Sequence, residues 1–140
     1  MAPRRLGGLG YRGRMATIGS LLAVLHLWVA IAGAIVAGIL VVVGLLDGAG
    51  IVAARRWLDR LATLLFVTMV AAVLLGPGIM AGVGMPSSPV HFLLAAIAVL
   101  TVPALRLLAI RRSSTHLGWW MAAGAVVTLL ALLGLWSTGS

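Results

Sequence analysis

The sequence predicts an all-α integral membrane protein, an antiparallel bundle of four helices with no soluble domain. Three observations lead to this prediction. The 140-residue chain is 63% hydrophobic, far above the range of soluble proteins. It contains four apolar runs long enough to cross a hydrocarbon core of about 30 Å as helices, and Arg106 is the one permanently charged residue in them. In lipid every backbone amide needs a partner within its own segment, so these runs have to be helical.

The four apolar runs cover residues 16–46, 61–83, 90–110 and 117–136. With their helical flanks, the spans are expected at about 16–46, 58–83, 89–110 and 117–136. Short links make successive spans antiparallel. Together the spans form one membrane domain, residues 16–140, because a chain of this length leaves no room for a separate soluble unit.

Span one follows a basic, Gly-rich tail, residues 1–15, which is expected to be flexible because it lacks the apolar content to fold alone. A basic stretch before an apolar run also resembles a signal peptide, with Ala32-Gly33-Ala34 as a cleavage pattern. The apolar run continues well past that point, so we expect the tail to be retained. The run would reach about 46 Å as one helix, so span one must tilt or project beyond the hydrocarbon.

Prolines and serines shape spans two and three. Gly76-Pro77-Gly78 is expected to weaken span two, because proline lacks a backbone donor and crowds the preceding turn. Ser87 or Ser88 is expected to cap span three, with Pro89 in its first turn. Pro103 is expected to bend span three.

The sparse acids and absent cysteines exclude several kinds of chemistry. Without cysteine there is no disulfide, thiolate metal site or iron–sulfur cluster. The two acidic residues, Asp47 and Asp59, lie near the first link, so paired-carboxylate catalysis and carboxylate-bound magnesium are not expected. Small multidrug exporters rely on a carboxylate in span one, which this chain lacks. We therefore expect no enzyme, and transport is the least favoured function.

Ten arginines without any lysine give the net charge of +8. They flank the spans, where they meet anionic lipid head groups, so nucleic acid is not expected as a partner. Arg106 lies close enough to the end of span three to snorkel. The arginines expected to contact lipid or partner subunits are Arg4, Arg5, Arg12, Arg14, Arg55, Arg56, Arg111 and Arg112.

Orientation follows from how these arginines are distributed. Four spans put both termini and the second link on one side, with four arginines, and the other two links on the opposite side, with six. The positive-inside rule favours the six-arginine side in the cytoplasm, hence termini outside a bacterial inner membrane. The arginines next to span one favour the reverse. Trp119, Trp120 and Trp136 sit at the ends of span four, where interfacial aromatics belong.

Two histidines are the candidate functional residues. His26 lies well inside span one and His91 in the first turn of span three, whereas His116 lies in a polar link. Helix geometry places positions four and seven residues further on the same face. These positions form a stripe of small residues below each histidine, which lets helices pack closely or leaves a slot for a flat ligand. The slot candidates are Ala30 and Gly33, and Ala95 and Ala98.

The segments LHLWVAIAGAIV and VHFLLAAIAVLT, around His26 and His91, read as a weak parallel repeat. Such a repeat would bring two imidazoles together, as the axial ligands of one b-type haem. The expected depths oppose this, because His26 lies further into its run than His91 does. The resulting difference along the membrane normal exceeds about 7 Å, and a tilt of span one would have to absorb it. The competing interpretation is that both histidines only hydrogen-bond to neighbouring helices, with no cofactor.

One histidine on each of two spans resembles the membrane subunits of b-type cytochromes and half of the haem A synthase bundle. The layout is also similar to a group of small bacterial four-helix membrane proteins, of no established activity, with a Leu-His pair opening span three and a Gly-hydrophobic-aromatic-x-Thr-Gly close. Here these are Val90-His91, with valine replacing leucine, and Gly134-Leu135-Trp136-Ser137-Thr138-Gly139. The resemblance implies a respiratory or photosynthetic electron-transfer setting.

Small residues at helical spacing indicate tight packing within the bundle or against partner subunits. They are Ala34, Gly38, Gly44, Gly48, Gly78 and Gly82. We expect a small accessory subunit of a larger membrane complex. The alternative is a cytochrome subunit that holds one haem between His26 and His91.

Overall fold

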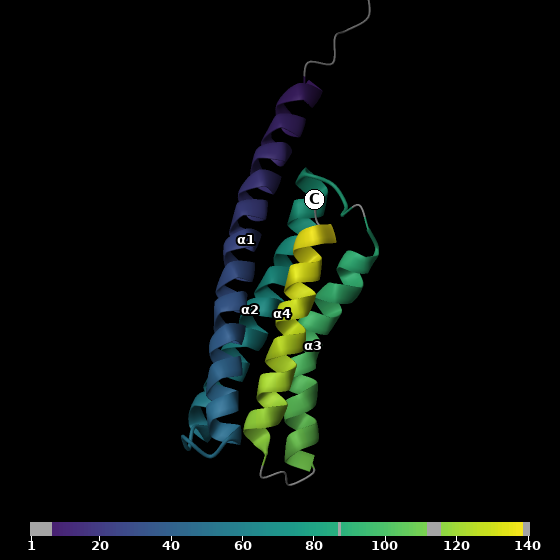
Figure 1. Cartoon of the computed structure of the whole chain (residues 1–140). Coiled ribbons are helices and arrows are strands. Elements are labelled where there is room, and N and C mark those ends of the chain that lie inside the picture. The colour runs from purple at the N-terminus through teal and green to yellow at the C-terminus, as the bar shows by residue number, and fades with distance from the viewer. Residues whose placement is uncertain (1–6, 87, 112–115, 139–140) are drawn as a thin grey trace, which may run out of the picture.

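The computed structural model describes residues 7–86, 88–111 and 116–138, with side chains from Gly13 onward. These residues form four α-helices, each long and apolar enough to span a membrane, and no strand. The helices run antiparallel in sequence order (Figure 1). They are α1 (Gly7–Gly48), α2 (Arg55–Gly82), α3 (Val90–Arg111) and α4 (Leu117–Thr138). The predicted all-α four-helix membrane bundle is confirmed.

The start of α1 differs most from the prediction. The helix begins at Gly7, within the segment 1–15 expected to be a flexible tail, and runs for 42 residues. Extending an existing helix requires no new nucleus, so a long apolar helix carries the polar residues ahead of it into its own ladder. The N-terminal end of α1 therefore projects past the other helices (Figure 1).

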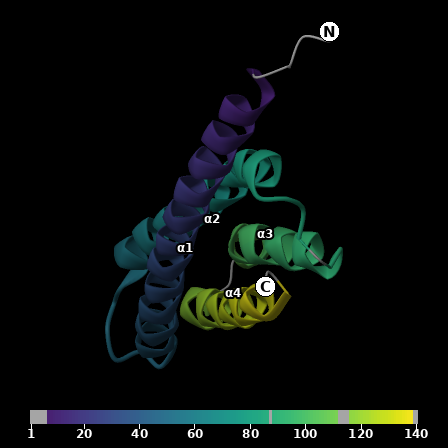
Figure 2. The ribbon, with the colours of Figure 1, turned by 90° about the horizontal axis from the view of Figure 1, so that it is seen from above.

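The four helices do not pack against one another to the same extent. Helix α1 packs along α2 and α4, and α3 packs along α4, whereas α2 and α3 touch less and α1 and α3 do not touch. Seen from above, the α1–α2 pair and the α3–α4 pair diverge at the end that carries the termini (Figure 2). In α4, 44% of the most apolar stretch is buried, against 17% in α2 and α3, so α4 is the most enclosed helix.

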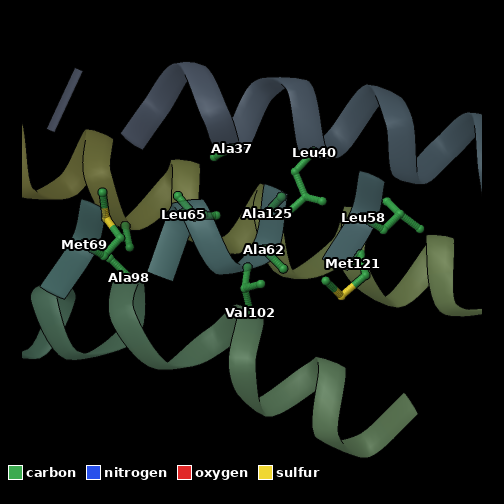
Figure 3. Close-up of a cluster of buried hydrophobic side chains, with 11 residues drawn as sticks. Ala37, Leu40, Leu58, Ala62, Leu65, Met69, Ala98, Val102, Met121 and Ala125 are labelled. Carbon is green, nitrogen blue, oxygen red and sulfur yellow. The ribbon is translucent and has the colours of Figure 1, made fainter. Parts of the chain in front are cut away.

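Small and medium side chains fill the core between the helices (Figure 3). Larger residues would force the helices apart, so this composition permits close contact along their length. The core residues are Ala37, Leu40, Leu58, Ala62, Leu65, Met69, Ala98, Val102, Met121, Ala125 and Ala131.

Prolines and caps act largely as expected. Ser88 Oγ accepts from Val90 N at 3.2 Å and caps α3, while Ser87 lies outside the described residues. Helix α3 continues through Pro103, and its upper end leans away from the other helices (Figure 1). Helix α2 stays helical through Pro77 to Gly82, so the expected weakening there does not end the helix. Packing against α1 supports the helix on both sides of the proline.

Candidate functional site

His26 joins α1 to α2. Its Nδ1–H donates to the carbonyl of Ala72 at 2.9 Å, and the side chain is half-buried. A carbonyl can only accept, so the proton is on Nδ1 and Nε2 is left as the free lone pair. Ala72 precedes Val73, whose carbonyl has no backbone donor because the residue four positions on is Pro77, so His26 binds α2 next to the interrupted hydrogen bond.

His91 makes the corresponding contact in the second hairpin. Its Nδ1 lies 3.4 Å from Thr138 Oγ1, which itself donates to the carbonyl of Gly134 at 3.0 Å. Since the hydroxyl proton is used on Gly134, the hydroxyl oxygen can accept from Nδ1–H of His91. Each histidine thus ties its own helix to the next one in the chain. The two hairpins share this feature, in line with the weak repeat.

The two histidines lie at similar positions along the bundle. Gly44 meets Gly118 where α1 crosses α4; His26 precedes Gly44 by 18 residues and Thr138 follows Gly118 by 20. At 1.5 Å per residue the difference is about 3 Å, and His91 contacts Thr138. Because α1 begins well beyond the ends of its neighbours, counting from the start of the apolar run overstates the separation of His26 and His91 along the bundle (Figure 1).

The small-residue stripes are not an open slot along their whole length. The Met69 side chain fills the space above Gly33, and Met69 also belongs to the core cluster that contains Ala98 (Figure 3). Ala30 and Ala95, one turn below the histidines, remain half-buried. The two imidazoles fit axial ligation of a haem by their donor atoms, but the lower half of the predicted slot is filled by Met69.

Other predicted packing residues occupy different environments. A Cβ on Gly44 would lie 2.7 Å from the carbonyl oxygen of Gly118, and one on Gly48 would meet the Trp119 ring at 2.8 Å. A Cβ on Gly82 would lie 2.6 Å from the backbone of Gly19, and one on Gly78 would lie 2.5 Å from the Leu22 side chain. Ala34 is half-buried, and a Cβ on Gly38 would meet nothing within 4 Å. The close contacts hold α1 against α4 at one end and against α2 at the other.

The arginines flank the bundle as expected where the structure describes them. Arg14, Arg55, Arg56 and Arg111 have exposed side chains. Arg12 is part of α1, while Arg4, Arg5 and Arg112 lie outside the described residues. Arg60 lies over the Trp57 ring at 5.6 Å, and Trp119 Nε1 donates to the carbonyl of Gly48 at 2.8 Å.

The sequence analysis missed the pairing of Arg106. Arg106 Nη2 lies 2.9 Å from Asp59 Oδ1, an ion pair that joins α3 to α2. The sequence did contain a signal for this pair, because Arg106 is the one charge inside the spans and Asp59 is one of only two acids. The other acid, Asp47, accepts from the Ala54 amide at 2.8 Å through Oδ1 and organises the first link.

Among the described residues, no three histidine, cysteine or acidic side chains are grouped to hold a metal ion. Comparison of the chain with protein-family models, with curated proteins and with solved structures finds no match. The fold and its apolar helices therefore define the class: an all-α, multi-pass membrane protein in contact with lipid. Its most distinctive internal feature is the pair of histidines at similar positions along the bundle.

Proposed function

We propose that this protein is a small, non-catalytic accessory subunit that packs within a larger membrane assembly. The observation that carries the proposal is the low burial of α2 and α3, whose most apolar stretches are only 17% enclosed by the bundle. Asp59 is paired with Arg106 and Asp47 accepts from the Ala54 amide, so the two acids do not form a carboxylate pair for acid–base catalysis. The resemblance to b-type cytochrome membrane subunits favours a respiratory or photosynthetic electron-transfer complex as the assembly.

Native mass measurement after extraction in mild detergent tests this proposal. We expect the chain to be recovered with other integral-membrane subunits in a fixed ratio. Leu100→Trp, on the exposed side of α3, should weaken the assembly. Leu133→Trp, on the exposed side of α4, is the matched control for added bulk. Recovery as a lone, stable monomer with turnover of any substrate would contradict the proposal.

We further propose a bacterial inner membrane location with both termini outside. The support is the larger number of arginines beside the first and third links. The natural chain has no cysteine, so single cysteines report position cleanly. Cysteines at Gly50 and Ser114 should react from the cytoplasm, and those at Gly10, Ser88 and Ser140 from outside. The opposite labelling pattern reverses the orientation.

The second candidate function is a cytochrome subunit with one b-type haem held by His26 and His91. Two observations favour it: the similar positions of the two histidines along the bundle, and Nδ1 atoms engaged with the next helix, which leave both Nε2 atoms as ligands. A haem in this position would supply one-electron transfer. Ala30 and Ala95 would face the ring, and Met69 would have to withdraw from Gly33.

A visible spectrum of the purified protein separates the two functions. A haem gives a reduced-minus-oxidised band that disappears in both His26→Ala and His91→Ala. Met69→Ala widens the space above Gly33 and should raise haem occupancy if the ring enters there. A colourless protein, or a band that survives both histidine substitutions, leaves the cofactor-free accessory subunit.

A further inference from the structure

The ion pair between Asp59 and Arg106 lies near one end of α2 and of α3 and is partly exposed at the surface of the bundle. Asp59 is four residues from the start of α2 and Arg106 five residues from the end of α3, which places the pair about 6 to 8 Å inward from both helix ends. The side chains of Arg106 and Asp59 are 37% and 43% exposed, respectively. The pair is therefore accessible from outside the bundle, at the seam between α2 and α3.

Arg106 has more donors than the described residues can satisfy. Nη2 contacts Asp59, whereas Nε is buried without an acceptor among the described residues. The remaining acid, Asp47, is committed to the Ala54 amide in the first link. Nε cannot be reached from outside the bundle, but the Arg106 side chain is 37% exposed, so an external acceptor can reach the exposed part of the guanidinium, and phosphate matches its planar donor geometry.

The charges around the pair select an anion. Arg55 lies one turn before Asp59 on the same face of α2, and Arg111 ends α3; both side chains are exposed. An apolar side chain continues this face of α2 inward: Phe66, two turns after Asp59, is 39% exposed. The seam thus has a cationic end at the head-group level and an apolar end for acyl chains.

We propose that the α2–α3 seam is a binding site for an anionic phospholipid, with its phosphate on Arg106 beside Asp59 and its acyl chains over Phe66. Arg55 adds a second cation at the head-group level. The site lies at the end of the bundle opposite the histidines, and it is independent of the function proposed above.

Competition between phosphatidylglycerol and phosphatidylcholine in reconstituted vesicles, read by native mass measurement of retained lipid, tests the site. The double variant Asp59→Asn with Arg106→Gln removes both charges together, so no unpaired charge is left in the membrane. We expect its preference for phosphatidylglycerol to fall about fivefold, the effect of one arginine near an anionic surface. Asp59→Asn alone should keep or raise the preference, because it leaves Arg106 available to the phosphate.

Two controls distinguish this site from general charge attraction and from a free anion. Arg56→Gln removes one exposed arginine outside the seam and should change the preference less than the double variant. Inorganic phosphate that displaces the lipid effect completely would identify a free anion as the ligand and overturn the lipid assignment. An unchanged preference for phosphatidylglycerol in the double variant also overturns the lipid assignment. If the double variant instead loses a co-purifying protein while its lipid preference stays intact, the ligand of the seam is a protein partner.

Discussion

Met69 on α2 fills the space directly above Gly33 on α1, so that a side chain at position 33 has to displace the Met69 methyl group. This contact holds α1 against α2. It also fills the part of the predicted slot that lies further from the two histidines. The proposed absence of a cofactor therefore depends in part on a packing contact, and mutations can measure the strength of that contact.

Gly33→Leu should destabilise the bundle by about 1–3 kcal/mol, because it overpacks the site that Met69 occupies. Met69→Ala should cost about 2 kcal/mol or more through the cavity it leaves. In the double variant the new leucine fills that cavity, so the two losses should not add, and the coupling should reach about 1 kcal/mol. Unfolding in mixed detergent micelles measures all three. Simple additivity would show that the two residues do not share one space.

Gly118→Ala should separate α1 from α4. A Cβ there would lie 2.5 Å from both the Gly44 carbonyl oxygen and the Gly48 nitrogen, which are backbone atoms that cannot turn aside. We expect a loss of about 3 kcal/mol. Gly38→Ala is the matched control, since its Cβ meets nothing, and it should be neutral or stabilising by up to about 1 kcal/mol. Equal losses in the two variants would refute this account of the interface.

His26→Leu should cost about 1 kcal/mol, because it removes the donor to the Ala72 carbonyl. His26→Gln keeps an amide donor and should recover part of the loss. His91→Leu should cost less, since its contact with Thr138 is long at 3.4 Å. The measurement is again the unfolding free energy of the haem-free protein. A larger loss for His91→Leu would reverse the assigned order.

Asp47→Ala should loosen the first link, because the Ala54 amide loses its acceptor, at a cost of about 1 kcal/mol. Asp47→Asn retains a side-chain oxygen and should stay close to the natural protein. Protection of the Ala54 amide from hydrogen exchange reports the contact directly. Unchanged protection in Asp47→Ala would show that the carboxylate has no such role.

Hydropathy and charge predicted the helices well, since the membrane allows only one backbone solution for an apolar run. They did not predict how far one helix slides past another. Register depends on single close contacts, such as Gly19 with Gly82 and Gly44 with Gly118, and many glycines at similar spacing compete for that role. Gly38 has the expected spacing but faces no neighbour. The depth of His26 relative to His91 could not be read from the sequence for the same reason.

The ion pair between Asp59 and Arg106 has a consequence for biogenesis. Helix α2 leaves the ribosome before α3, so Asp59 enters the bilayer first and has no partner until Arg106 arrives. A lone arginine in a span inserts poorly, whereas one that meets a waiting carboxylate does not carry an isolated charge into lipid. We expect α3 to enter the membrane less efficiently in a chain with Asp59→Leu than in the natural chain, as measured by glycosylation of a site engineered beyond Arg111. The membrane insertion of α3 during synthesis and the contact of α2 with α3 in the final structure would then depend on the same two side chains.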